Sequence, residues 1–147
     1  MKKHWLWTLG SAVLGVVFIF SMVGAADAPE TIELNSKVYG KHRKSLVTFT
    51  HKKHAEDYKV ACADCHHVYK DGKNVWKEGD PVQKCEECHS KDKPSPDERK
   101  TMSDAEKMKN FHYEAIHENC KGCHMELKKA GKPTGPVSCT DCHPREK

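Results

Sequence analysis

The chain has 147 residues, about one domain's worth, with 25 Lys and Arg against 21 Asp and Glu, and with eight Cys and eleven His. The 122 residues after residue 25 contain only 14 Leu, Ile, Val and Phe, about 11%, whereas disorder is suspected below roughly 20%. Because their charge is nearly balanced, this composition argues against both disorder and an ordinary enzyme with its own apolar core. It favours a chain in which disulfides, metals or a large cofactor replace the missing core.

The first 25 residues differ from the rest of the chain. Met1-Lys2-Lys3-His4 is basic, an apolar run extends from Trp5 to about Val23, and Val23-Gly24-Ala25 supplies small residues for cleavage. This pattern predicts a secretory signal peptide. The apolar run of about 19 residues is also long enough to span a bilayer, so an uncleaved membrane anchor is the alternative. We expect residues 1–25 to be a signal peptide or anchor and residues 26–147 to be an exported domain, where free thiols tend to oxidise unless they are bound.

Strand-like alternation begins the exported domain. It covers Thr31–Val38 and Leu46–Thr50 and predicts a small N-terminal β-hairpin, with an exposed His42 in its loop. A short helix around His51–Tyr58 is expected to follow. The fold class that we expect is mostly irregular, with short α-helices and this small hairpin.

Turns and helices are predicted farther along the chain. Asp71-Gly72-Lys73-Asn74 and Glu78-Gly79-Asp80-Pro81 are turn signals. Ser103-Asp104-Ala105-Glu106 is a capping box, and it should open a helix that carries His112 and His117. The apolar residues of this helix recur at a spacing of three to four: Ala105, Met108, Phe111, Ala115 and Ile116. A further helix over Cys120–Ala130 should end at Gly131 and Pro133.

All eight cysteines fall in four C-x-x-C pairs, and a histidine follows each pair directly. The motifs are Cys62-Ala63-Asp64-Cys65-His66, Cys85-Glu86-Glu87-Cys88-His89, Cys120-Lys121-Gly122-Cys123-His124 and Cys139-Thr140-Asp141-Cys142-His143.

This pattern is the attachment signature of c-type haem. Two thiols a short arc apart can add to the two vinyl groups of one porphyrin, and the adjacent His can supply its imidazole to the iron. A zinc ribbon would also use pairs such as Cys62…Cys65 and Cys85…Cys88, and a four-disulfide secreted scaffold is a second alternative. Neither needs a His after every pair, so we expect four covalent haems c.

Six further histidines outside residues 1–25 are candidates for the second axial positions. Methionine is the competing ligand, but Met102, Met108 and Met125 are too few for four irons. The candidate histidines are His42, His51, His54, His67, His112 and His117.

Their spacing suggests how some of them are used. His51 and His54 are three apart, so on a helical turn they share one face and could reach two neighbouring haems. His67 directly follows His66, and neighbouring side chains diverge, so His67 could reach a second haem. His112 and His117 are five apart and point in different directions, which leaves one of them as the ligand. Simple solvent exposure is the alternative for His51, His54 and His67.

The histidine and C-x-x-C-H segments of this sequence resemble those of a known family. Phe49-Thr50-His51-Lys52-Lys53-His54, followed by Cys62…Cys65-His66-His67, resembles the class III multihaem cytochromes c (cytochrome c3) of sulfate-reducing bacteria. The stretch from Ala115-Ile116-His117 to Cys142-His143 is similar to their smaller three-haem relatives. The resemblance covers roughly residues 31–147. It differs in two ways: some members use a longer Cys-to-Cys spacing at haems 2 and 4, and the segment from Lys91 to Asn110 is longer here.

The resemblance implies a set of axial ligands and a cytochrome c3-like fold wrapped around four haems. His117 is preferred to His112 because it lies three residues before Cys120, like the corresponding ligand of the relatives. The implied pairs are His66 with His51 for haem 1, His89 with His67 for haem 2, His124 with His54 for haem 3, and His143 with His117 for haem 4.

Iron held by two histidines has no open position, so the chain is expected to be an electron carrier with no substrate chemistry of its own. The resemblance implies a periplasmic shuttle in anaerobic, sulfate-reducer-like respiration. Its electrons would come from hydrogenase or formate dehydrogenase and pass to membrane cytochrome complexes. A dedicated haem subunit of a membrane-bound complex is the first alternative. A metal or oxyanion reductase is the second, if one iron lacks its distal ligand.

Charge refines the expected partners. Eight haem propionates would make the holoprotein acidic, so nucleic acid is not an expected partner, and a membrane is one only if the N-terminal segment stays uncleaved. Residues 120–147 are locally basic, and Lys128, Lys129 and Lys132 are candidates for docking an acidic redox partner near haem 4. The basic residues of the hairpin loop, from Lys41 to Lys44, are expected to matter less. A solvated basic tail is the alternative.

Overall fold

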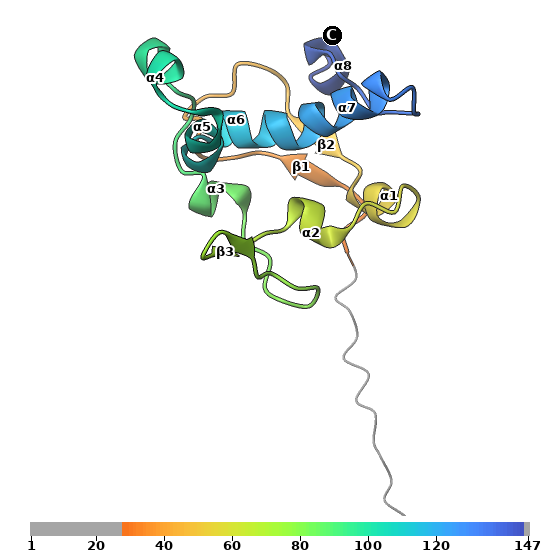
Figure 1. Ribbon diagram of the computed structural model, residues 1–147. Helices are drawn as coiled ribbons and strands as arrows, with labels where there is room; N and C mark the ends of the chain where they lie inside the picture. The colour runs from red at the N-terminus through yellow and green to blue at the C-terminus, as the bar shows by residue number, and fades with distance from the viewer. Residues whose placement is uncertain (1–27, 146–147) are drawn as a thin grey trace, which may run out of the picture.

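The computed structural model describes residues 28–145, which form short helices and two small sheets joined by irregular segments (Figure 1). The expected fold class is confirmed. The predicted signal peptide or anchor at residues 1–25 lies outside the described residues. Over residues 28–145, no helix combines the length and the apolar character of a membrane span.

The N-terminal hairpin is present but shorter than predicted. Strand β1 (Ile32–Leu34) runs antiparallel to β2 (Val47–Phe49), with Ile32 opposite Phe49. Pairing stops after three residues because the Asn35 amide turns back to the Glu33 carbonyl, at 3.0 Å. Residues 35–46 therefore form a long loop rather than a tight turn.

Helix α1 (His51–Glu56) directly follows β2 and ends two residues before the predicted end. The Asp57 and Tyr58 amides both bond to the Lys53 carbonyl, and Lys59 adopts a left-handed φ of 55°. This backbone conformation ends the helix and turns the chain toward the first C-x-x-C motif.

Three of the C-x-x-C motifs are single helical turns. They are α2 (Cys62–Cys65), α3 (Cys85–Cys88) and α8 (Cys139–Cys142). In each turn, the amide of the following histidine bonds to the carbonyl of the first cysteine, at 2.8–2.9 Å. The turn holds the two cysteines of the motif within one short helical segment, and the histidine follows immediately after it.

Both predicted turns between the first two motifs are confirmed. Strands β3 (Tyr69–Lys70) and β4 (Lys73–Asn74) pair across Asp71 and Gly72, which both have positive φ. The second turn contains Gly79, at φ 96°, and the Asp80 amide bonds to the Lys77 carbonyl. The two-residue strands of this hairpin are too short to leave an alternating pattern.

The segment from Lys91 to Asn110, which is longer here than in the family that the sequence resembles, contains two capped helices. Helix α4 (Pro96–Thr101) begins at Ser95, and α5 (Asp104–Asn110) begins at Ser103. Each serine hydroxyl accepts a hydrogen bond from the amide of the glutamate three residues later, Glu98 or Glu106. The side chain of that glutamate in turn accepts a hydrogen bond from the serine amide. The second capping box was predicted, whereas α4 was not, although Ser95 and its Glu98 carry the same signal.

The single helix predicted from residue 104 through His117 is wrong. Phe111 is extended, with φ −113° and ψ 122°, and separates α5 from α6 (His112–His117). The His112 and Tyr113 amides bond to the carbonyls of Lys91 and Asp92, at 2.8 and 3.0 Å, instead of continuing the helical ladder. Pairing with a distant segment therefore overrides the local helical pattern.

Beyond the break, the helical run extends from residue 112 to residue 129 and crosses the middle of the molecule (Figure 1). It consists of α6, a π-helical turn η1 (Glu118–Gly122) and α7 (Cys123–Lys129), so the third motif straddles the junction of η1 and α7. The run ends before Gly131, at φ 67°, which confirms the predicted stop.

Almost nothing forms an apolar core. Among residues 28–145, Phe111 is the one buried aliphatic or aromatic hydrophobic side chain, 2% exposed, and the other buried residues are Ser36, Pro94 and His112. The elements are therefore held in place mainly by contacts other than apolar packing of side chains on one another.

Because Phe111 is the buried hydrophobic residue at the α5–α6 break, we expect Phe111→Ala to lower the free energy of unfolding by about 3 kcal/mol. Val82→Ala is the control, since Val82 is 61% exposed and its loss should cost less than about 0.5 kcal/mol. Denaturant unfolding of the holoprotein, followed by circular dichroism, measures both. Equal midpoints for the two variants would contradict this role of Phe111.

Candidate functional site

Four pairs of imidazole rings lie at similar separations in the structure. The ring centroids are 6.1 Å apart for His51 and His66, 5.8 Å for His67 and His89, 6.2 Å for His54 and His124, and 6.5 Å for His117 and His143. Each pair contains one histidine that ends a C-x-x-C-H motif and one that does not. These are the same pairs that the resemblance implied.

This separation suits two imidazoles on opposite sides of one metal ion. A metal–nitrogen bond is about 2.0 Å, so two such nitrogens lie about 4 Å apart, and about 1 Å more on each side reaches the ring centres, giving roughly 6 Å. All four pairs fall near this value. The donor set therefore fits a metal with two axial nitrogen ligands.

Hydrogen bonds fix the orientation of five of these eight rings. In each case the ring Nδ1 donates to a backbone carbonyl, because a carbonyl can only accept, and this leaves Nε2 unprotonated for a metal. The bonds run from His54 to Thr50 (2.8 Å), His89 to Lys109 (3.2 Å), His117 to Tyr113 (2.7 Å), His124 to Pro136 (2.8 Å) and His143 to Ser45 (2.7 Å).

His51 is an exception among the paired rings. Its Nδ1 is buried and has no hydrogen-bond partner. The pKa of its neighbour His66 is lowered by burial, and by the positive charges that His51 and His67 would carry. The neutral form of His66 is therefore favoured, and this is the form that binds a metal.

The two remaining histidines after residue 27 have other partners. His112 is 6% exposed, and its Nδ1 lies 2.8 Å from the Tyr39 hydroxyl. Burial raises the pKa of Tyr39 to about 12 and lowers that of His112, so both are neutral near pH 7. His42, predicted to be exposed, is half-buried against the Tyr39 ring and bonds to the Asn35 side chain at 3.0 Å.

None of the eight cysteines forms a disulfide bond. Burial, together with smaller effects of negative charge on the thiols of Cys65, Cys142 and Cys85, raises the pKa of Cys120 to about 11. One thiol from each of the other three motifs is therefore close enough to Cys120 to influence its pKa.

This arrangement differs from that of a zinc ribbon or a disulfide scaffold. Among residues 28–145, no three His, Cys, Asp or Glu side chains gather into a metal-binding cluster. The donors are arranged instead as pairs of imidazoles, and one histidine of each pair directly follows a C-x-x-C pair in the chain. That is the arrangement that four covalent haems c need.

Two residues near the first motif were missed by the sequence analysis as contributors to the site. The Asn74 side chain donates to the carbonyls of Ala63 and His66, at 3.3 and 3.2 Å, and accepts from the Val68 and Trp76 amides. The Trp76 ring lies 5.1 Å from the His66 ring. Asn74 stood in a predicted turn, but no local signal shows that the turn folds back onto the motif.

The hairpin loop is closer to the fourth motif than the sequence suggested. Besides the bond from His143 to the Ser45 carbonyl, the Ser45 hydroxyl donates to the Pro144 carbonyl at 2.6 Å. A surface pocket there is lined by residues of both segments: His42, Arg43, Lys44, Ser45, His143, Pro144 and Arg145. The loop whose basic residues were expected to matter less for docking therefore lies beside the fourth motif.

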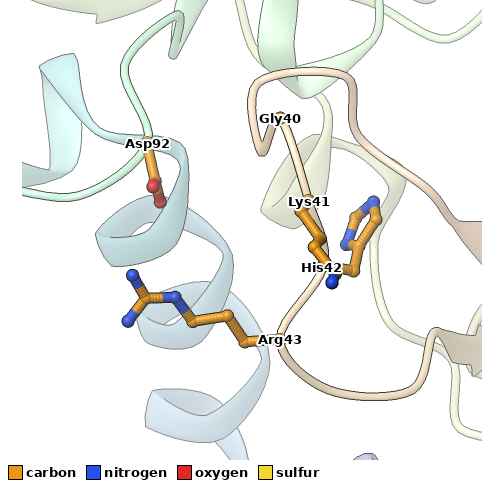
Figure 2. Close-up of a pocket in the computed structure, with 5 residues that line it drawn as sticks. All are labelled: Gly40, Lys41, His42, Arg43 and Asp92. Atoms are coloured by element: carbon orange, nitrogen blue, oxygen red, sulfur yellow. The ribbon is translucent and has the colours of Figure 1, made fainter.

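A second pocket lies beside the first and shares its basic wall. It is lined by Gly40, Lys41, His42, Arg43 and Asp92. Figure 2 shows Lys41, His42 and Arg43 along the loop, and Asp92 on a separate segment across from them. Lys128 and Lys129, by contrast, end α7, whose first turn carries Cys123 and His124 of the third motif.

Comparison with known proteins gives consistent matches. The sequence model of the class III cytochrome c family matches residues 26–143. A cytochrome c3 of Maridesulfovibrio salexigens is 37% identical over 127 residues, covering 82% of this chain and 99% of the relative. The 26 kDa cytochrome c3 of Desulfomicrobium norvegicum is 31% identical over 122 residues, covering 80% of this chain and 96% of the relative. A solved high-molecular-weight cytochrome c from Desulfovibrio vulgaris (Miyazaki F) aligns with 80% of this chain and 20% of its own, at 28% identity and a TM-score of 0.44.

Proposed function

Because the chain belongs to the class III cytochrome c family, whose members are multihaem electron-transfer cytochromes, we propose that it is a periplasmic electron carrier with four covalently attached haems c. Residues 1–25 direct its export. The proposal includes anaerobic, sulfate-reducer-like respiration as the setting, with hydrogenase or formate dehydrogenase as the source of electrons and membrane cytochrome complexes as their destination.

The proposal assigns every cysteine and eight histidines to haem binding. Each C-x-x-C pair forms the two thioether links of one haem, and the histidine of the motif is its proximal ligand. The distal ligands are His51 for the first motif, His67 for the second, His54 for the third and His117 for the fourth.

The observation that carries this assignment is the set of four imidazole pairs with centroids 5.8–6.5 Å apart. In these four pairs each motif histidine has one partner imidazole, and no imidazole serves two motifs. The bond between His112 and Tyr39 supports His117 as the fourth distal ligand, because it gives His112 another role.

A bound haem c supplies reversible one-electron chemistry at its iron. The protein's part is to hold two imidazoles on each iron, which leaves no position for a substrate. The Nδ1 bonds to backbone carbonyls hold these rings at a fixed orientation and keep Nε2 available as the ligand. Such a site favours electron transfer over substrate chemistry, because little has to move when the iron changes its charge.

For the docking of an acidic partner, we propose the surface beside the fourth motif. Arg43, Lys44 and Arg145 are exposed there and line the pocket that includes His143. Surface charges act over about 8–10 Å at physiological ionic strength, so charges beside the docking haem should control the rate of association.

The first prediction tests the number and coordination of the haems. The intact mass of the mature holoprotein should exceed that of the polypeptide by four haems, and carbon monoxide should bind poorly to the reduced protein. A mass that matches the bare polypeptide would rule out the cofactor assignment. Ready binding of carbon monoxide at one haem would reveal an open iron and favour a reductase instead.

The second prediction concerns the adjacent histidines His66 and His67. Because we assign His67 to the second motif, His67→Ala should turn one iron of four high-spin, which optical and electron paramagnetic resonance spectra detect. His42→Ala is the matched control, since His42 bonds to Asn35 and belongs to none of the four pairs. A His67→Ala spectrum identical to that of the control would remove His67 from the ligand set.

The third prediction concerns docking. Reversing Arg43, Lys44 and Arg145 to Glu should slow electron uptake from an acidic hydrogenase, mainly through the association rate and most strongly at low salt. Reversing Lys70, Lys73 and Lys77 changes the net charge equally, on the β3–β4 hairpin and just after it. This hairpin lies across the molecule from α8 in Figure 1, so the change should have less effect. Stopped-flow reduction at low and high salt compares the two variants. Equal slowing in both would refute docking beside the fourth motif.

A further inference from the structure

One glycine lies unusually close to an imidazole of the proposed haem-binding set. A Cβ built on Gly135 would lie 2.5 Å from Cε1, 2.7 Å from Nε2 and 3.0 Å from Nδ1 of His124. Side-chain carbons do not approach other atoms so closely, so no other residue fits this position unless the ring or the loop moves. Gly135 has no positive φ that would require glycine for backbone reasons. The contact with His124 is therefore what demands a residue without a side chain.

The loop that carries Gly135 is attached to the same histidine at two points. The Thr134 hydroxyl donates to the His124 carbonyl at 2.8 Å, and the His124 Nδ1 donates to the Pro136 carbonyl at 2.8 Å. Thr134 thus bonds to the backbone of His124, Gly135 lies against its ring, and Pro136 accepts from its Nδ1. Together they form a clamp, defined here as Thr134, Gly135 and Pro136.

The clamp cannot easily move away from the ring. Pro133 and Pro136 have restricted backbone torsions. The loop begins where the Lys132 amide bonds to the Leu127 carbonyl, and it ends at Ser138, whose hydroxyl caps α8. A methyl group at position 135 would therefore displace the His124 ring more readily than the loop.

We infer that Gly135 is a positioning residue for the third haem, because its missing side chain lets the Thr134–Pro136 clamp hold the His124 imidazole with Nε2 directed toward the metal. The inference rests on the proposed function, in which His124 and His54 are the axial ligands of that haem. It assigns to this loop a control over ligand orientation, and therefore over the spectrum and potential of one haem among four.

Gly135→Ala in the holoprotein tests the inference. Gly40→Ala is the matched control, because Gly40 also lacks a positive φ and a Cβ there would meet nothing within 4 Å. We expect the electron paramagnetic resonance spectrum of Gly135→Ala to change in one low-spin signal, about a quarter of the total, while that of Gly40→Ala matches the wild type. The midpoint potential of one haem should shift in the same variant.

Two further variants make the result specific. His54→Ala identifies the signal of the third haem, and the signal that moves in Gly135→Ala must be the same one. Thr134→Val removes one anchor of the clamp without adding bulk, and it should shift that signal by a smaller amount. If Gly135→Ala does not accumulate, or loses one haem by mass while Gly40→Ala keeps four, Thr134→Val must still move the third-haem signal for the inference to stand.

The outcomes separate this inference from the proposed function. A wild-type protein without four low-spin haems would refute the proposed function itself. A normal wild type in which Gly135→Ala and Gly40→Ala have the same spectra and potentials would refute only the role of Gly135. A change in the signal of any haem other than the third would also refute it.

Discussion

Four pairs of imidazole rings, with about 6 Å between the two rings of a pair, bring together parts of a chain in which almost no hydrophobic side chain is fully buried. Among the described residues, long-range side-chain hydrogen bonds at a histidine or the residue next to one join Tyr39 with His112, His89 with Lys109, His143 with Ser45, and Ser45 with Pro144, and an ion pair joins Arg99 with Glu114. One buried phenylalanine cannot hold 118 residues together. His89 and His143, two of the rings that would bind metal, therefore also hold distant segments together.

This dependence explains which features the sequence could predict. Local signals, such as the capping box at Ser103, the turn at Asp71-Gly72 and the helix stop at Gly131, act through neighbouring residues and were read correctly. The C-x-x-C-H motifs are also local, because covalent attachment needs its residues in one short arc. The ring pairs in the structure match the pairs that the family resemblance implied, although spacing alone had left the distal histidines open.

The features that could not be predicted arise from long-range pairing. The helix break at Phe111 depends on hydrogen bonds to the carbonyls of Lys91 and Asp92, about 20 residues earlier in the chain. A periodic apolar pattern reports only on neighbouring residues, so it cannot show this pairing. Similarly, the approach of the 41–45 loop to His143 joins residues 98 positions apart. The need for glycine at position 135 could not be predicted for the same reason, because it comes from the close approach of the His124 ring and not from the local backbone conformation.

One loop contributes to both the ligand geometry and the proposed docking surface. The Ser45 carbonyl holds the His143 ring, while the side chains of Arg43 and Lys44 project from the adjacent backbone into the shared pocket. Reversing these two charges leaves the carbonyl in place, so slower association without a changed haem spectrum would reflect electrostatics alone. A change at the Ser45 backbone would instead alter the ring and therefore the spectrum. Because the two functions reside in different atoms of the same loop, they can be varied separately, and kinetic and spectroscopic measurements on one variant are enough to tell them apart.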